Sequence, residues 1–225
     1  MKNYLIASVL LAVFTMPCAA QFRDSAAAKA ALSGKTARER LDAIEYLGAQ
    51  RSQDAYAALA GHFPSEKDAY LRVQIVEALD VAGSTWAYFC AEKAADDANR
   101  AVRQAAAAAI ALKAGDPAAD KKLKALAADA SEPVRFAVVH ALSLRPGPSS
   151  AAIIGGVLAD QKAALRMRRV AAWALSNMKT PEADAELMKH ISDADPEIQA
   201  AAVSRKPAAK EPAAKEPAEA GGAKP

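Results

Sequence analysis

The stretch EPVRFAVVHALSLRPG (residues 132–147) has the outline of one complete helix. Helix-compatible residues run from Val134 to Arg145, between a Glu-Pro start and a Pro-Gly stop. Proline is tolerated in the first turn because its missing N–H group needs no partner there, and glycine just past the end takes the left-handed cap at little steric cost. The stretch holds no obvious catalytic group, yet its outline returns several times along the chain.

An arginine near the start of this helix marks each copy of a repeat. Successive copies lie 31 to 33 residues apart, and an incomplete copy begins at Gln199. The positions three, four and seven residues after the arginine are apolar in every copy, and the residue before it is apolar in every copy but the first. This spacing predicts one buried helical face, repeated five times. The anchor residues are Arg40, Arg72, Arg103, Arg135 and Arg168.

Each copy also carries an earlier helix. Ser52 begins one, Asp116-Pro117 another and Thr180-Pro181 a third, with residues that favour helix starts. The unit is therefore helix, turn, helix in about 32 residues, and a fixed period of that size indicates a solenoid. A single pair cannot cover its own apolar face, so neighbouring pairs must stack. Glycine is expected to end four of the anchored helices, at Gly48, Gly83, Gly115 and Gly147.

The composition agrees with an all-α chain of small, closely packed helices. Of 225 residues, 52% are hydrophobic, mostly alanine, and only 5% are aromatic. The formal charge of +3 is too small to indicate a nucleic-acid partner, because phosphate binding needs several clustered cations.

The first twenty residues have the layout of a secretory signal peptide. Lys2 is followed by an apolar run over 4–16 and by a Cys18-Ala19-Ala20 site before Gln21. The run is shorter than the roughly 20 residues of a membrane span. Lipidation of Cys18 is disfavoured because Met16 and Pro17 precede it, where lipoprotein signals present small residues. We expect a mature chain that begins at Gln21, is periplasmic or secreted, and has Cys90 as a buried, unpaired cysteine.

The other end of the chain is a proline-punctuated segment. Pro207, Pro212 and Pro217 follow one another at a five-residue period, and lysine and glutamate balance. Such a composition cannot bury a core, so we expect a disordered tail, either without specific contacts or acting as a spacer. The sequence predicts a signal peptide (1–20), a lead-in (21–35), a repeat array (36–203) and this tail (204–225).

The helical pair with "D…VR…A…AL" in its second helix resembles the HEAT repeat, and the short period resembles the HEAT-like repeats of phycobilin-lyase-type proteins. The pattern stands at 97–115, 129–147 and, less cleanly, 160–178. The resemblance implies a right-handed α-solenoid of about five repeats, an armadillo-type superhelix. It also implies a structural ladder in which arginines bond to aspartates of the inter-helix turns, with Arg72, Arg103, Arg135, Arg168, Asp97 and Asp129 as its members.

No pattern indicates an enzyme, a metal or a cofactor. HEAT-like hydroxylases use His-Glu pairs to hold iron, whereas here the residues after His62, His140 and His190 are not glutamate. The histidines are far apart in sequence, and no nucleophile elbow, phosphate loop or Cys-x-x-Cys occurs. The expectation is a chain without catalytic residues, metal or cofactor.

A binding surface is indicated on the anchored helices, because the positions one and five after the arginine turn away from the buried face. Early copies place acids there or nearby, including Asp42 and Asp80, and later copies place aromatic and basic residues. Aromatic and arginine side chains are typical interface anchors, although the large rings could instead pack against adjacent repeats. The candidate partner-binding residues are Glu45, Glu77, Phe136, His140, Arg169 and Trp173.

These observations predict an exported scaffold that binds an unidentified protein through the ridge of its second helices. The alternatives are an envelope spacer or assembly factor without a specific site on the ridge, and a non-catalytic subunit of a lyase-like enzyme. No nucleic-acid partner is expected, and no membrane span after signal cleavage.

Overall fold

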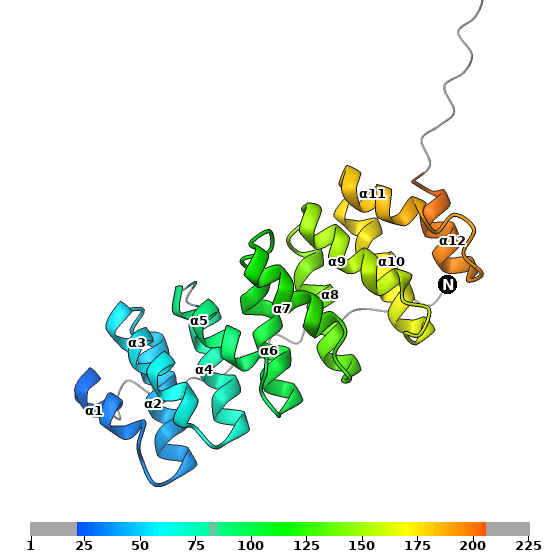
Figure 1. Ribbon diagram of the computed structural model, residues 1–225. Helices are drawn as coiled ribbons and strands as arrows, with labels where there is room; N and C mark the ends of the chain where they lie inside the picture. The colour runs from blue at the N-terminus through cyan, green and yellow to red at the C-terminus, as the bar shows by residue number, and fades with distance from the viewer. Residues whose placement is uncertain (1–21, 82, 84, 206–225) are drawn as a thin grey trace, which may run out of the picture.

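A computed structural model describes residues 22–81, 83 and 85–205, and these residues form twelve α-helices, one short 3-10 helix and no strand (Figure 1). The predicted signal peptide, Cys18 and almost all of the predicted tail lie outside the described residues. None of the described helices is both long and apolar enough to cross a membrane. The helices are α1 (Ser25–Ala31), α2 (Ala37–Ala49), α3 (Gln53–His62), η2 (Phe63–Ser65), α4 (Ala69–Val81), α5 (Thr85–Ala94), α6 (Arg100–Ala111), α7 (Pro117–Ala127), α8 (Glu132–Ser143), α9 (Pro148–Ala159), α10 (Leu165–Met178), α11 (Pro181–Met188) and α12 (Pro196–Val203).

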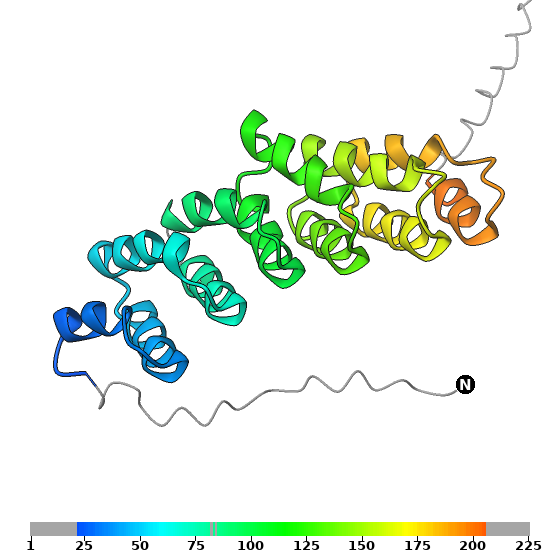
Figure 2. The same ribbon diagram turned by 60° about the horizontal axis from the view of Figure 1, so that its bottom comes forward.

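The α-helices form consecutive antiparallel pairs that stack into an elongated array. Figure 2 shows two layers, with the first helix of each pair in one and the second helix in the other. In the second layer α2, α4, α6, α8, α10 and α12 each contact the next one along. The predicted all-α solenoid is confirmed, with six helix pairs among the described residues where the sequence indicated about five. The additional pair is α11 with α12, which the sequence indicated only as an incomplete copy at Gln199. The expected lead-in contains α1, whose Ala28 is fully buried and which completes the first pair.

Local sequence explains where the helices begin. Thr36 accepts a hydrogen bond from the Glu39 N–H, and the Glu39 carboxylate accepts one from the Thr36 N–H, so the two form a capping box at the start of α2. Ser52, Asp116 and Thr180 each cap a helix with a side-chain oxygen that accepts a hydrogen bond from a backbone N–H group of the first turn, without the reciprocal bond. The turns therefore supply partners for N–H groups that the first turn of a helix leaves free.

Of the four expected glycine stops, Gly83 is correct: it follows the end of α4 with a positive φ angle of 62°, which favours glycine. Gly115 also has a positive φ angle, of 102°, but it lies in the turn before α7, beyond the α6 cap at Leu112. Gly48 instead lies within α2, where an added Cβ would come within 3.0 Å of the Ala78 side chain, so its small size allows α4 to approach. Gly147 is extended and precedes α9.

The core lies between the two helix layers and consists of the positions that the repeat spacing predicts. The residues seven after the arginine are fully buried, as Leu79, Ile110 and Leu142 illustrate. Cys90 is also buried, unpaired and part of this core, and burial raises the pKa of its thiol to about 12. A thiol in that state is a small hydrophobic side chain at neutral pH.

Candidate functional site

A row of arginine–carboxylate pairs links successive repeats and fixes how the second helices stack. Arg72, near the start of α4, donates from Nε to Asp97 Oδ2 at 2.7 Å, and Arg103 on α6 bonds to Asp129 at the same distance. Each arginine also donates from Nη1 to carbonyl oxygens of its own preceding turn. Such bidentate, charge-assisted bonds hold two turns in one geometry.

The first rung of this ladder was not predicted from the sequence. Arg40 donates from Nε and Nη2 to the buried Glu66 carboxylate at 2.8 and 3.2 Å, and His62 lies 3.1 Å from the same group. Burial opposes the ionisation of Glu66, but the bonds from Arg40, the Asp68 N–H and His62 outweigh it and lower its pKa to about 2. Glu66 lies three residues before the first residue of α4, and Asp97 and Asp129 lie at the same position before α6 and α8. This shared position is the sequence signal that could have identified Glu66 as a member of the ladder.

Arg135 departs from the predicted ladder. Its Nη1 donates to the carbonyl oxygens of Asp129 and Ala130, and it makes no bond to a carboxylate of the following turn among the described residues. The reason is that Lys162 stands two residues before Ala164, where the turns before α4, α6, α8 and α12 place an acid. The expected aspartate partner of Arg135 is therefore wrong.

The last rung is built on α10 and the turn before α12. Arg168, which is buried, donates from Nε to the Leu158 carbonyl oxygen at 3.0 Å and from Nη2 to Asp193. His190 lies 3.2 Å from the same aspartate. Although burial opposes ionisation, bonds from the Asp195 N–H, His190 and Arg168 lower the pKa of Asp193.

The ladder predicts an acid-dependent stability. The pKa values of Glu66, Asp97 and Asp129 are lowered in the folded state. Their ionised forms therefore stabilise the fold above the unfolded pKa values near 4, and this stabilisation is lost as the pH falls toward 2. We expect the melting temperature to fall steadily between pH 4.5 and 2. Glu66→Gln should lower stability at pH 7 by about 1–2 kcal/mol and flatten this dependence. An unchanged pH profile in this variant, compared with exposed Glu182→Gln, would contradict the prediction.

Three grooves follow one another over the exposed surface of the second helices, and all six candidate partner-binding residues line them. The first groove lies between α2 and α4 and includes Glu45 and Glu77. The second crosses α4, α6 and α8, and it shares Glu77 with the first. The third lies between α8 and α10, and it shares Phe136 and His140 with the second. The structure thus places the candidates on one continuous face, which we call the second-helix surface.

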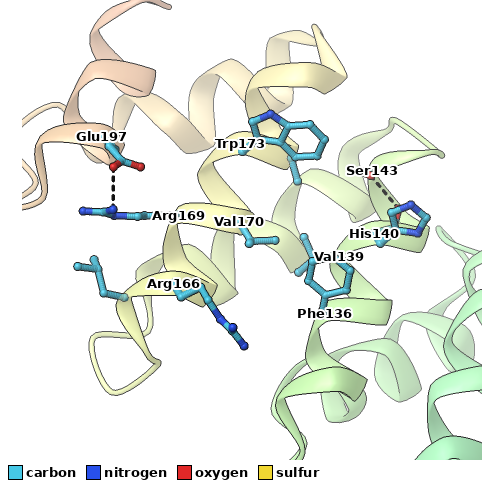
Figure 3. Close-up of a pocket in the computed structure, with 11 residues that line it drawn as sticks. Phe136, Val139, His140, Ser143, Arg166, Arg169, Val170, Trp173 and Glu197 are labelled. Carbon is cyan, nitrogen blue, oxygen red and sulfur yellow. Dashed lines mark hydrogen bonds and ion pairs between the residues drawn. The ribbon is translucent and has the colours of Figure 1, made fainter. Parts of the chain in front are cut away.

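The α8–α10 groove is the most apolar part of this surface. It encloses about 560 Å³, a volume typical of ligand pockets. Figure 3 shows Phe136, Val139 and His140 on α8 opposite Val170 and Trp173 on α10. The Phe136 and His140 rings stack with centroids 6.3 Å apart. Sequence reasoning missed Val139, Leu165, Val170 and Glu197 in this pocket, because their convergence depends on how α8, α10 and α12 stack.

The two largest rings of the pocket are not core residues. Trp173 is 64% exposed and Phe136 is 48% exposed, so neither is buried against an adjacent repeat. Exposed rings that line the same concave site resemble interface anchors rather than isolated surface hydrophobics. This placement favours the binding interpretation over the packing interpretation that the sequence left open.

The basic character expected at this end of the surface is neutralised within the chain. Arg169 donates from Nη2 to Asp195 and from Nη1 to Glu197, both at 2.7 Å (Figure 3 draws the latter bond). Arg166 bonds to Glu132 at 2.6 Å. The basic residues expected at this end of the surface are present, but acids of the same chain pair with them, so the rim of the pocket contains internal ion pairs.

The acidic end of the surface is smaller than the sequence suggested. Glu45 and Glu77 are exposed, as expected. Asp42, expected nearby on the surface, is 1% exposed and pairs with Arg38. Asp80 is half-buried at the edge of the second groove.

The described residues contain no group of three or more histidine, cysteine or acidic side chains placed to hold a metal ion. His62 and His190 instead contact ladder carboxylates, and His140 is exposed on the second-helix surface.

Comparisons with known proteins agree with this architecture. Residues 91–167 match the family model for HEAT repeats. A search of curated proteins gave no match. A designed armadillo repeat protein in complex with the peptide (KR)4 aligns with a TM-score of 0.52 and 20% identity, over 79% of this chain and 96% of that one. The CpcE–CpcF complex of phycocyanin lyase from Nostoc sp. PCC7120 aligns with a TM-score of 0.52 and 22% identity, over 81% and 75%.

The fold is a helical-repeat α-solenoid whose second helices present one continuous face. The repeats within residues 91–167 match the family model for HEAT repeats, and the rest of the array has the same helix-pair architecture. At these identities the two solved structures are similar to this chain in fold, and a fold alone does not determine function.

Proposed function

We propose that this protein is an exported, non-enzymatic scaffold that binds another protein through its second-helix surface. The observation that carries the proposal is the α8–α10 pocket, where the exposed Trp173 and Phe136 stand over a floor that includes Val139 and Val170. Apolar rings surrounded by satisfied ion pairs are the arrangement of an interface hot spot with its polar rim.

Three further observations support a protein ligand. The grooves continue over successive helices, which suits an extended chain better than a small molecule. The armadillo repeat protein of similar fold is itself a peptide complex. Two of the three histidines bond to ladder carboxylates, which favours a structural role for them over a catalytic one. Export rests on the N-terminal sequence pattern.

The proposal is tested by affinity capture from an envelope extract with immobilised residues 21–225. Wild-type protein and the Tyr70→Ala control should retain the same partner, because Tyr70 is an exposed ring on α4 outside the three grooves. Phe136→Ala and Trp173→Ala should lose it. A partner that all four proteins retain, but that a form without residues 207–225 loses, would move the binding site to the tail and contradict the proposal.

A further inference from the structure

The middle groove carries charge that the chain itself does not neutralise. It encloses about 490 Å³ and is walled on one side by Glu77 and Asp80 of α4 and on the other by Phe136 and His140 of α8. Its floor is α6, which contributes only Gln104 and three alanines there. Because three of these four side chains are alanines, α6 leaves open space beside the acids of α4.

Neither acid has an ion-pair partner among the described residues. Glu77 accepts one hydrogen bond, from Gln74 Nε2 at 3.2 Å. Asp80 is half-buried, and the positive charge of Arg145 acts on it without a direct ion pair. Burial raises the pKa of Asp80. This differs from the ladder acids, where arginine bonds help to lower the pKa of the carboxylate.

Uncompensated acids beside an apolar pocket select a partner of defined chemistry. We propose that the second-helix surface binds an extended protein segment in which a lysine or arginine and a large apolar side chain lie about four to five residues apart. The cation would lie over α6 between Glu77, Asp80 and the ring of Phe136, and the apolar side chain would fill the α8–α10 pocket. This inference rests on the proposed function and adds the identity of the side chains recognised.

The spacing follows from the packing of the helices. Neighbouring helices pack about 8–10 Å apart. The α8–α10 pocket therefore lies about one and a half helix spacings from the floor of the middle groove, on the order of 12–15 Å. An extended chain advances about 3.3 Å per residue, so roughly four to five residues cover that distance. The two grooves adjoin, because Phe136 and His140 line both.

Other occupants fit the surface less well. The acids of α4 repel the phosphates of nucleic acids and anionic lipids. The chain's own residues 206–225 include lysines, but they contain no aromatic or branched aliphatic side chain that could fill the pocket. A basic, partly apolar segment of another protein satisfies both grooves.

The unpaired state of Asp80 has a consequence for stability. Because its pKa is raised on folding, the folded state loses stability as the pH rises through the unfolded and folded pKa values. Asp80→Asn should therefore raise the melting temperature slightly at pH 7 while weakening cation binding. A melting temperature that falls instead would show that the carboxylate serves the fold and would contradict its assignment to a partner.

The binding side is tested with a phage-displayed library of random twelve-residue peptides, selected on immobilised residues 21–225. Wild-type protein should enrich peptides with lysine or arginine four to five positions from tryptophan, phenylalanine or leucine. The Glu77→Gln, Asp80→Asn double variant should keep the apolar preference and lose the cationic one. Trp173→Ala should keep the cationic preference and lose the apolar one. Glu182 is an exposed acid of α11, and the Glu182→Gln control should enrich the same peptides as wild type.

Affinities for the enriched peptides complete the test. The best wild-type peptide should bind the double variant about tenfold more weakly at low salt, with a smaller salt dependence. Enriched peptides without a cation, or an unchanged cationic preference in the double variant, would overturn this inference and leave the proposed function intact. If no peptide is enriched and envelope capture also fails, the proposed function itself is contradicted.

Discussion

Replacing Leu142 with alanine is expected to destabilise the array by about 2–5 kcal/mol, the range for a buried leucine whose removal leaves a cavity. Leu142 is fully buried on α8, which contacts the helices of its own pair and of both neighbours. α8 therefore helps to hold three repeats together, and the loss of a buried side chain from it should appear as a lower midpoint in chemical denaturation. A broader transition should accompany it, because a repeat array unfolds less cooperatively when one interface is weakened.

Leu144→Ala supplies the matched control. This leucine lies two residues further along, just beyond α8, and is 64% exposed. Its removal should change stability by less than about 0.5 kcal/mol, as for most surface substitutions. Equal losses in the two variants would show that α8 is rotated from the position described here.

The buried face of the second helices could be predicted because helix periodicity alone determines it. A residue three, four or seven positions after the arginine lies on one side of the helix whatever its neighbours are, and Ile75, Val76 and Leu79 are all fully buried. The exposed position of Trp173 follows from the same geometry. The sequence could therefore predict which face of the second helices carries the site, but not that a pocket lies there.

The pairing of charges depends on contacts between repeats, which periodicity does not reveal. Arg169 is neutralised by Asp195 and Glu197, at the turn before α12 and in its first turn, 26 and 28 residues away. Arg135 lacks an acid because the position that should supply one holds Lys162. In both cases the residues of the next inter-helix turn determine whether the arginine pairs with a carboxylate or bonds only to backbone carbonyl oxygens.

The grooves could not be predicted from the sequence, because they form where small side chains leave space between neighbouring helices. The open floor of the middle groove results from the small side chains of α6, including Ala105 and Ala108. Alanine-rich sequence indicated close packing, and it does produce close packing on the inner side of α6, where Ala106 and Ala107 are fully buried. On the outer side the same residue type leaves a recess beside the larger residues of α4 and α8.

Trp173→Ala is expected to lower affinity for the captured partner at least about thirtyfold while leaving melting nearly unchanged. An interface anchor typically contributes 2 kcal/mol or more, which corresponds to that factor. Trp173 is 64% exposed in the free protein, so little of its ring packs in the core, and its truncation should cost the fold less than about 0.5 kcal/mol. The ring lines the pocket together with Val139, Val170 and Phe136, and a partner's apolar side chain would enter this pocket (Figure 3).

Affinity and melting should be measured on the same preparation of each variant, because the two interpretations of Trp173 differ in which quantity changes. If the ring packed in the core, truncation would cost about 3–5 kcal/mol of stability, and weaker binding would only follow from unfolding. If the ring anchors a partner, the affinity falls while the melting temperature stays the same. Phe136→Ala should behave in this way, whereas Tyr70→Ala should change neither quantity. Because the rim arginines are already paired within the chain, the lost affinity should depend little on salt, which distinguishes this apolar anchor from the acidic groove beside it.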